Sequence, residues 1–250
     1  MSCEVWWAWT GDVRAEHEAL LDTPERRRLA TFRRDDDRSR YVTGCALTRL
    51  ALGLRQDRHP AAVEIDRTCP SCGEPHGPPR VAGGPAISVA HSGELVAVAF
   101  AFAGGAGVRV GIDVERIDDA AGVVELAGEP VLSEAEGRQL HALPHAARHA
   151  ALLRFWTRKQ AVLKATGDGL GVEPSAVAVS GPSAPARLLG FRGRPGLEER
   201  ARLIDLFPAP GYAGALCLLD ADGAPDASGG RDAPAPVVEH DAGALLRSAV

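Results

Sequence analysis

The chain has 250 residues, enough to bury a sizeable core in one large domain or in two small ones. Its formal net charge of −5 excludes a protein that binds nucleic acid through an overall positive charge. The apolar stretch near the start is too short for a signal peptide or a membrane span, and five cysteines, an odd number, indicate free thiols. We therefore expect a cytoplasmic protein that contacts neither membranes nor nucleic acid.

The first part of the chain predicts a strand followed by a long helix. Residues 5–10 are apolar and rich in Trp, which favours a strand. Thr23 followed by Pro24 is typical of a helix start, and residues 25–54 have a helical pattern. The arginines of this helix are balanced by Asp35–Asp37, which favours a solvated face, while a patch for a polyanionic ligand is the alternative. These arginines are Arg26, Arg27, Arg28, Arg33, Arg34, Arg38 and Arg40.

Two cysteines and a histidine follow in a loop rich in Pro and Gly, after residues 63–66, which could form a strand. Cys69 and Cys72 stand in the segment CPSCG, and His76 follows four residues later. The pattern is similar to half of a zinc knuckle, but zinc takes four ligands and there is no second CxxC. His59 could complete a Cys2His2 set, although the spacing fits no standard finger, so free thiols are the expected state.

Residues 86–102 predict two strands around a tight turn, with His91 at the bend. A histidine there is more often a satisfied turn residue, but its place at the end of an apolar strand leaves a functional role open. Residues 104–107 form a flexible junction and are the candidate domain boundary.

The segment VRVGIDVERID alternates as a strand does, with Gly111, Asp113 and Glu115 on one face and apolar residues on the other. Two carboxylates two residues apart are about 7 Å from each other, so both could reach one cation. Gly111 has no side chain, which would leave room for a ligand on that face. The alternative is an ordinary amphipathic strand with solvated acids.

The second part of the chain predicts two helices and then a second sheet. Ser133 and Glu136 form a capping box at the start of one helix, and Pro144 starts the next. Strands are expected at residues 177–179, 203–206 and 213–219. Residues 220–236 have the composition of a disordered segment. The last residues regain a strand-like and then a helix-like pattern and could dock back onto the body.

The chain contains only two lysines, and both lie in the helical segment FWTRKQAVLKATGDGLG at residues 155–171. Gln160 and Lys164 are four residues apart and share a helix face, with Lys159 beside it. Gly167 is a plausible helix stop. Lysine is a compact, movable charge that arginine does not replace in a tight pocket, so the pair indicates an anion site on one helix unless it is a coincidence.

The carboxylate pair, the lysine-bearing helix and the histidine at a strand end favour one kind of chemistry. Mg2+ typically takes one or two carboxylates and leaves its other positions to water and phosphate oxygens. Lysines nearby would neutralise the same phosphates. Positioning and charge neutralisation supply most of the catalysis in phosphoryl transfer, which is the predicted reaction class.

At these residues the sequence resembles the 4'-phosphopantetheinyl transferases, in the larger, monomeric type that serves polyketide and nonribosomal peptide synthetases. One signature of the family stands here as GIDVE at residues 111–115, and a second as WTRKQAVLK at residues 156–164. The segment AHSG at residues 90–93, the arginine-rich first helix and the loop at residues 75–79 are also similar to the family's pattern.

The resemblance implies an α/β (α+β) fold, a pseudo-twofold pair of similar subdomains, each a small, mostly antiparallel sheet packed on helices. The expected divisions are an N-terminal half at residues 1–106, a C-terminal half with the metal and phosphate motifs at 107–220, and a flexible tail at 221–250. Coenzyme A would lie between the halves. The segment 117–142 would face the acyl or peptidyl carrier protein.

The implied reaction is attack by a carrier-protein serine on the β-phosphate of coenzyme A, with release of 3',5'-ADP. Asp113, Glu115 and Gln160 would hold Mg2+, and Lys159 and Lys164 would meet the phosphates. The resemblance thus makes the catalytic set Asp113, Glu115, Gln160, Lys164 and His91. The 3'-phosphate or pyrophosphate end would be bound by His91, Arg33 and Arg40.

Two positions depart from the family's pattern. Gln160 stands where the family usually has Glu, and an amide can ligate a metal but cannot accept the serine proton. The base would then be a water, Asp113 or His91. Pro78 stands where a Lys is usual, and Arg80 could supply that charge. These departures leave two alternatives open: a coenzyme A-binding protein with weakened or lost activity, and a zinc-assisted interaction module.

Overall fold

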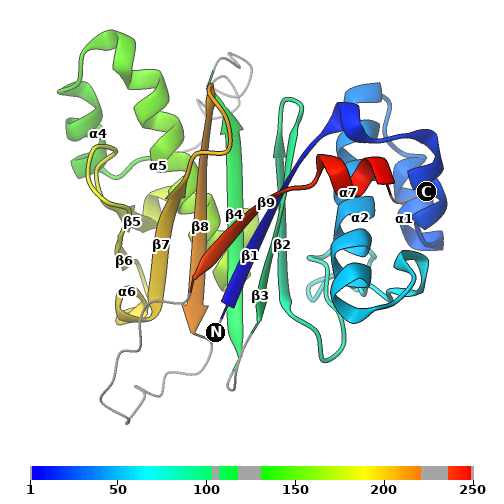
Figure 1. The fold of residues 1–250 in the computed structure, drawn as a ribbon. Coiled ribbons are helices and arrows are strands. Elements are labelled where there is room, and N and C mark those ends of the chain that lie inside the picture. Colours follow the sequence, from blue (N-terminus) through cyan, green and yellow to red (C-terminus); the bar gives the residue numbers. More distant parts are fainter. Residues whose placement is uncertain (1, 103–106, 118–130, 221–235, 249–250) are drawn as a thin grey trace. The chain divides into compact units, whose positions relative to one another are not determined.

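The computed structural model describes residues 2–102, 107–117, 131–220 and 236–248. It divides into two compact units. The N-terminal unit consists of Ser2–Phe102 and Pro236–Val250, and the C-terminal unit contains Ala103–Ala235. Each unit is a small sheet packed on a long helix (Figure 1).

The N-terminal unit contains a four-stranded sheet in the order β2-β3-β1-β9. Strands β1 and β2 each pair antiparallel with β3, whereas β9 pairs parallel with β1. The long helix α2 packs against β1, β2 and β3 and buries Leu47 and Leu50 with Val98 and Phe100. The strands are β1 (Ser2–Trp9), β2 (Ala86–Ser92), β3 (Leu95–Phe102) and β9 (Val237–Asp241). The helices are η1 (Thr10–Asp12), η2 (Ala15–Leu20), α1 (Thr23–Leu29), α2 (Asp35–Gln56), η3 (Pro60–Ala62) and α7 (Gly243–Ser248).

The end of the chain returns to the N-terminal unit. Strand β9 lies beside β1 in Figure 1, and the ring of His240 stacks on Trp6 at 4.2 Å between centroids. Leu246 of α7 is fully buried in the core of this unit, and its carbonyl is 3.0 Å from Nε2 of His17. The strand-like and helix-like patterns near the end of the sequence therefore do form a strand and a helix, which dock on this unit.

The C-terminal unit contains a three-stranded antiparallel sheet in the order β4-β8-β7 and a two-stranded sheet. Helix α5 packs on β4 and β8 and buries Phe155, Val162 and Leu163. The strands are β4 (Val108–Arg116), β5 (Val177–Val179), β6 (Leu188–Phe191), β7 (Ala201–Leu206) and β8 (Tyr212–Asp220). The helices are α4 (Glu134–His141), α5 (His145–Thr166), η4 (Gly169–Gly171), η5 (Pro174–Ala176) and α6 (Leu197–Arg200).

The predicted fold class is confirmed, since both units are similar subdomains of mostly antiparallel sheet and helix. The predicted boundaries of α5 are also confirmed: Pro144 precedes it, and Gly167 ends it with a left-handed backbone (φ 82°). The single helix expected at residues 25–54 is wrong, because α1 ends at Leu29 and α2 begins at Asp35. Three consecutive aspartates in the first turn of α2 favour a new helix start, since they complement the helix dipole.

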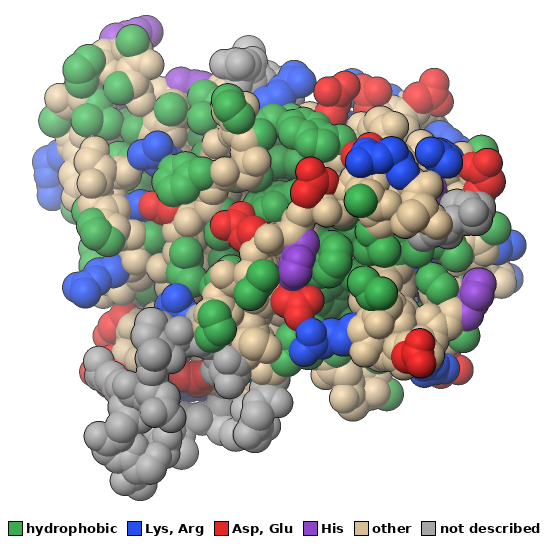
Figure 2. Space-filling view, in the orientation of Figure 1, with side chains coloured by type: hydrophobic (Ala, Val, Ile, Leu, Met, Phe, Trp, Pro, Cys, Tyr) green, Lys and Arg blue, Asp and Glu red, His purple; other side chains and the backbone are tan. Residues whose placement is uncertain are grey.

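Five of the seven arginines singled out in this region are exposed, namely Arg26, Arg27, Arg28, Arg33 and Arg34. Figure 2 shows basic and acidic side chains side by side over the region of α1, α2 and α7, at the right of the view. Such interspersed charges support the solvated face predicted for most of these arginines.

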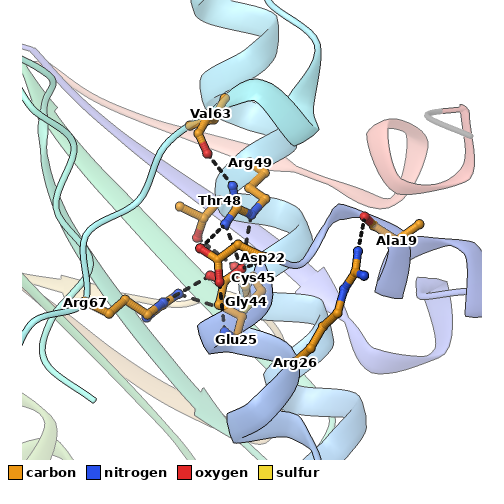
Figure 3. A network of polar contacts seen from close by, with 10 residues as sticks. All are labelled: Ala19, Asp22, Glu25, Arg26, Gly44, Cys45, Thr48, Arg49, Val63 and Arg67. Atoms are coloured by element: carbon orange, nitrogen blue, oxygen red, sulfur yellow. Dashed lines mark hydrogen bonds and ion pairs between the residues drawn. The ribbon is translucent and has the colours of Figure 1, made fainter. Parts of the chain in front are cut away.

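A buried ion pair joins the short first helix to the long helix of the N-terminal unit (Figure 3). Glu25 is the third residue of α1, in a capping box with Asp22, and Arg49 of α2 donates to its carboxylate at 2.8 Å. Both side chains are about 1% exposed, and Arg49 also donates to the carbonyl of Val63. Burial acts to raise the pKa of Glu25, but Arg49 and Arg67 hold that pKa below its ordinary value.

The C-terminal unit repeats this device. Glu136 is the third residue after the cap Ser133, in a second capping box, and Lys159 of α5 donates to its carboxylate at 2.7 Å. Lys159 is fully buried and also donates to the carbonyls of Pro174 at 3.0 Å and Val177 at 2.5 Å. Arg49 and Lys159 occupy the same position, the fifteenth, in two helices of 22 residues. The similarity of the subdomains thus extends to a buried polar contact.

Helix α5 approaches β4 closely at Gly111. A Cβ atom built on Gly111 would lie 2.0 Å from the carbonyl oxygen of Ala161 and 2.5 Å from the backbone nitrogen of Ala165. Any side chain would therefore collide with the helix backbone, which does not yield easily. The expectation that Gly111 leaves room for a ligand is wrong, because the helix occupies that room.

We expect the replacement Lys159→Met to destabilise the protein by about 3–5 kcal/mol, because it leaves the Glu136 carboxylate buried without its charged partner. Urea unfolding measures the change. Arg138→Met is the matched control. Arg138 and Glu134 form an exposed ion pair within α4, so this replacement should change the stability little. A Lys159 variant as stable as the control would contradict a structural role for this lysine.

We expect Gly111→Ala to destabilise the protein by about 3 kcal/mol or more, because the added methyl group meets backbone atoms of α5. The control is Gly137→Ala in α4, where an added Cβ has nothing within 4 Å. This control should be neutral or slightly stabilising, since alanine favours helix. Equal stability of the two variants, measured by thermal unfolding, would contradict the close packing of α5 on Gly111.

Candidate active site

The candidate site lies where β4 faces α5 in the C-terminal unit. Because side chains alternate along a strand, the face that carries Gly111 also carries Asp113 and Glu115. Their partners across the strand pair are small residues: Asp113 stands opposite Ala215 and Glu115 opposite Ala213. The two acidic side chains therefore point towards α5, with little bulk beside them.

Asp113 is held by Lys164. The Nζ atom of Lys164 donates to Oδ1 of Asp113 at 2.8 Å and to the carbonyl of Ile112 at 3.0 Å. The side chain of Asp113 is 9% exposed, whereas that of Lys164 is 29% exposed. Burial raises the pKa of the Asp113 carboxyl, and the charge and hydrogen bond of Lys164 oppose that rise. The Oδ2 atom of Asp113 is buried and has no hydrogen-bond partner among the described residues.

Glu115 on β4 and Gln160 on α5 complete the candidate site. Oε1 of Glu115 accepts a hydrogen bond from Nε1 of Trp156 at 3.0 Å. Trp156, Gln160 and Lys164 follow one another at four-residue spacing, so they form one row along α5. Gln160 lies between the two residues that contact Glu115 and Asp113. Its Nε2 atom is buried and likewise lacks a partner among the described residues.

The donor set fits a hard divalent cation. Buried polar atoms almost always have a partner, so two unpartnered atoms, one on β4 and one on the facing helix α5, indicate a place for a polar occupant. A carboxylate oxygen of Asp113, the carboxylate of Glu115 and the amide oxygen of Gln160, presented by turning the amide over, are ligands that Mg2+ accepts. The expected metal set of Asp113, Glu115 and Gln160 is therefore chemically suitable.

Lys159 does not belong to this row. Its three hydrogen bonds, to Glu136, Pro174 and Val177, use all three donors of an ammonium group. Burial lowers its pKa, and Glu136 opposes that shift. The expected contact of Lys159 with a phosphate is corrected here, because the ammonium group is fully buried and already satisfied.

The expected anion contacts of the N-terminal unit gather partly at one turn. Arg40 donates to the carbonyl of Gly93 at 2.7 Å and to Asp37 at 2.7 Å. The hydrogen bond from Arg40 lowers the pKa of Asp37, with smaller effects from the charges of Arg34 and His91. His91 is an exposed residue at the end of β2, as predicted. Arg40 and His91 thus lie near the same acidic group and the same turn.

Arg33 and Arg80 lie elsewhere in the N-terminal unit. Arg33 is exposed, just before α2. Arg80 is exposed and donates to the carbonyl of Thr68 at 2.5 Å and to Asp66 at 3.4 Å. Of the segment expected to face a carrier protein, residues 118–130 lie outside the described residues.

Two important contacts of the C-terminal unit could not be predicted from the sequence. Arg158 is fully buried and donates to both carboxylate oxygens of Asp205, at 2.8 and 2.6 Å, as well as to backbone carbonyls. Glu136 was recognised as a capping residue but not as the partner of Lys159. A capping glutamate three residues after serine is visible in sequence, whereas its second partner 23 residues away is not.

None of the helices in the described part of the chain has the length and apolar character needed to cross a membrane.

Comparison with known proteins identifies the family. The model of the 4'-phosphopantetheinyl transferase superfamily matches residues 109–217, a segment that contains all the candidate site residues on β4 and α5. The 4'-phosphopantetheinyl transferase HetI of Nostoc sp. is 31% identical over 172 residues, which are 68% of this chain and 69% of the relative.

Two further relatives are covered over a smaller share of their length. A phosphopantetheinyl transferase of Thraustochytrium sp. is 32% identical over 66% of this chain and 59% of its own. A putative 4'-phosphopantetheinyl transferase of Synechocystis sp., slr0495, is 28% identical over 62% of this chain and 60% of its own.

Among solved structures, a holo-(acyl-carrier-protein) synthase of Bacillus anthracis in complex with CoA (3',5'-ADP) aligns with 46% of this chain and 96% of its own, at 19% identity and a TM-score of 0.36. That likeness is too weak to add to the assignment, which rests on the family model and the curated relatives. The chain belongs to the 4'-phosphopantetheinyl transferase superfamily.

Proposed function

We propose that the protein transfers 4'-phosphopantetheine from coenzyme A to a serine of an acyl or peptidyl carrier protein, with Mg2+, and releases 3',5'-ADP. Family membership supports the reaction class. The observation that carries the proposal is the contact of Asp113 with Lys164, which joins the family's two signature segments at 2.8 Å. Service to polyketide or nonribosomal peptide synthetases, action as a monomer and a cytoplasmic location belong to the same proposal.

Asp113, Glu115 and Gln160 are the residues that would hold Mg2+. The unpartnered Oδ2 of Asp113 supports this role, since a bound cation would satisfy it. The metal would supply neutralisation of charge on the diphosphate of coenzyme A. Trp156 supports the same role indirectly, because its hydrogen bond at 3.0 Å fixes the orientation of Glu115.

Lys164 is the cation that we assign to the phosphates. Its partly exposed side chain can reach a ligand, and its bond to Asp113 holds the ammonium group beside the proposed metal position. Arg33, Arg40, Arg80 and His91 are proposed contacts for the 3'-phosphate or pyrophosphate. Arg40 is the best supported of these, because Asp37 and the Gly93 carbonyl already fix its guanidinium group.

The proton of the attacking serine needs an acceptor other than Gln160, which has no basic group. A water, Asp113 or His91 are the candidates. A carboxyl whose pKa is raised by burial is a better base than an ordinary one. With a metal bound, however, the charge on Asp113 would be shared, so water oriented by Asp113 is the acceptor that we favour.

The neutral Gln160 also favours a second candidate function, a coenzyme A-binding protein with weakened or lost transfer. The cysteine cluster that suggested an interaction module does not compete with either function, since it lies in a separate loop of the N-terminal unit.

Mass spectrometry of an apo carrier protein incubated with the protein, coenzyme A and Mg2+ tests the proposal. We expect the carrier to gain the mass of phosphopantetheine. Asp113→Asn should lower the rate at least about 100-fold, because it weakens both the metal site and the contact with Lys164. Glu198→Gln, at an exposed carboxylate on α6, should leave the rate unchanged. Binding of coenzyme A with no mass gain on any carrier would favour the second candidate.

The metal dependence of Gln160→Glu tests the site itself. The variant adds one negative charge to the proposed ligand set, so half-maximal activity should need at least about tenfold less Mg2+, equivalent to about 1.4 kcal/mol. Gln139→Glu, at an exposed position on α4, is the matched control. An identical Mg2+ requirement in all three proteins would count against Gln160 as part of the metal site.

A further inference from the structure

A second set of ligand-type side chains lies in the loop between α2 and β2. Cys69, Cys72 and His76 each offer a ligand atom, and these three atoms all lie within 4.8 Å of one another. The Sγ atom of Cys72 is 3.0 Å from Nε2 of His76. The proposed transfer reaction assigns no role to these three residues.

The backbone of the loop holds the three side chains together. The N–H of Cys69 donates to the carbonyl of Glu74 at 2.8 Å. The carbonyl of Cys69 in turn accepts a hydrogen bond from the N–H of Gly73 at 2.9 Å. Gly73 adopts a left-handed backbone (φ 78°), which closes the turn after Cys72. The N–H of Gly77 bonds to the carbonyl of Arg67 at 2.7 Å. The cluster is therefore formed by a closed turn and does not depend on chance contacts of side chains.

The two cysteines of the loop differ from the other three. Cys3, Cys45 and Cys217 are buried, and burial raises the pKa of Cys45 and of Cys217 to about 12. Cys69, in contrast, is half-buried, and Cys72 is exposed. A thiolate is the form that binds metal, and Cys72 and His76 are exposed, so an ion in solution can reach them.

We propose that Cys69, Cys72 and His76 bind one Zn2+ ion, with water or a donor from another molecule as the fourth ligand. Two thiolates and an imidazole are ligands that Zn2+ prefers. In a tetrahedral site, sulfur and nitrogen ligands are about 3.5 Å apart, so the contact between Cys72 and His76 must widen slightly. His59, the other histidine considered from the sequence, is not a member of the cluster among the described residues.

The ion would stabilise the loop that carries Arg80. The base of the loop is an antiparallel bridge in which Asp66 and Arg80 exchange two backbone hydrogen bonds of 2.8 Å. Zinc at the tip would close the same loop at its other end. Because the ion would order only this loop, the zinc proposal is independent of whether the protein transfers phosphopantetheine.

Cobalt titration of the full-length, reduced, chelator-treated protein tests the proposal, with zinc measured by competition and by elemental analysis. We expect one Co2+ per chain with thiolate-to-cobalt absorption, displaced by one Zn2+. Cys69→Ser, Cys72→Ser and His76→Ala should each weaken Zn2+ binding at least about 100-fold, beyond the usual effect of an outer-shell change.

His59→Ala and Cys45→Ala are the controls, and both should bind Zn2+ as the unmodified protein does. Circular dichroism of every variant separates loss of a ligand from loss of the fold. The proposal is overturned if the unmodified protein shows no thiolate-to-cobalt absorption, or if binding survives in a folded Cys69→Ser/Cys72→Ser double variant. A Cys69–Cys72 disulfide that persists under reducing conditions would overturn it as well.

Discussion

The contact of α5 with β4 at Gly111 is the constraint on which the candidate site depends. The missing side chain lets the helix backbone come within 2.0 Å of where a Cβ would stand. That approach fixes the register of helix against strand, which places Lys164 on Asp113 and Trp156 on Glu115. A helix held farther away by an ordinary side chain could not bring the two sequence signatures into hydrogen-bond contact.

Helix geometry also explains why the two lysines have different roles. Five residues correspond to about 140° around a helix axis, so Lys159 and Lys164 cannot both point at β4 from the same helix. Lys164 faces the acidic strand, and Lys159 faces the short helix α4 through Glu136. The N-terminal unit places Arg49 on Glu25 in the same manner. A buried cation that ties a capping glutamate to the long helix is thus a shared structural feature of both subdomains.

Much of the site was accessible from sequence because it follows local rules. The alternation of β4 placed Asp113 and Glu115 on one face, and four-residue spacing placed Gln160 with Lys164. The cap at Gly167 and the capping box at Ser133 are likewise local patterns, and both are present. The joining of the two segments came from their resemblance to a family, since no spacing rule pairs strand residues with helix residues 41 and 51 positions further along the chain.

The errors within the site came from contacts between distant segments, whereas the break between α1 and α2 is local. Gly111 alone predicts space for a ligand, because the sequence does not reveal which backbone fills that space. The sequence places Lys159 among the phosphate contacts, because its partner Glu136 stands in another helix. No sequence pattern marks an arginine as buried as Arg158. The parallel pairing of β9 with β1 joins the two ends of the chain, which periodicity cannot predict.

We propose that Asp113 and Glu115 on β4 and Gln160 on α5 form one metal site beside Lys164. Electron paramagnetic resonance of Mn2+, used in place of Mg2+, counts bound ions directly in the presence of coenzyme A. We expect one bound Mn2+ per chain, lost in Asp113→Asn and kept in Glu198→Gln. Equal Mn2+ binding by the unmodified protein and by Asp113→Asn would contradict it.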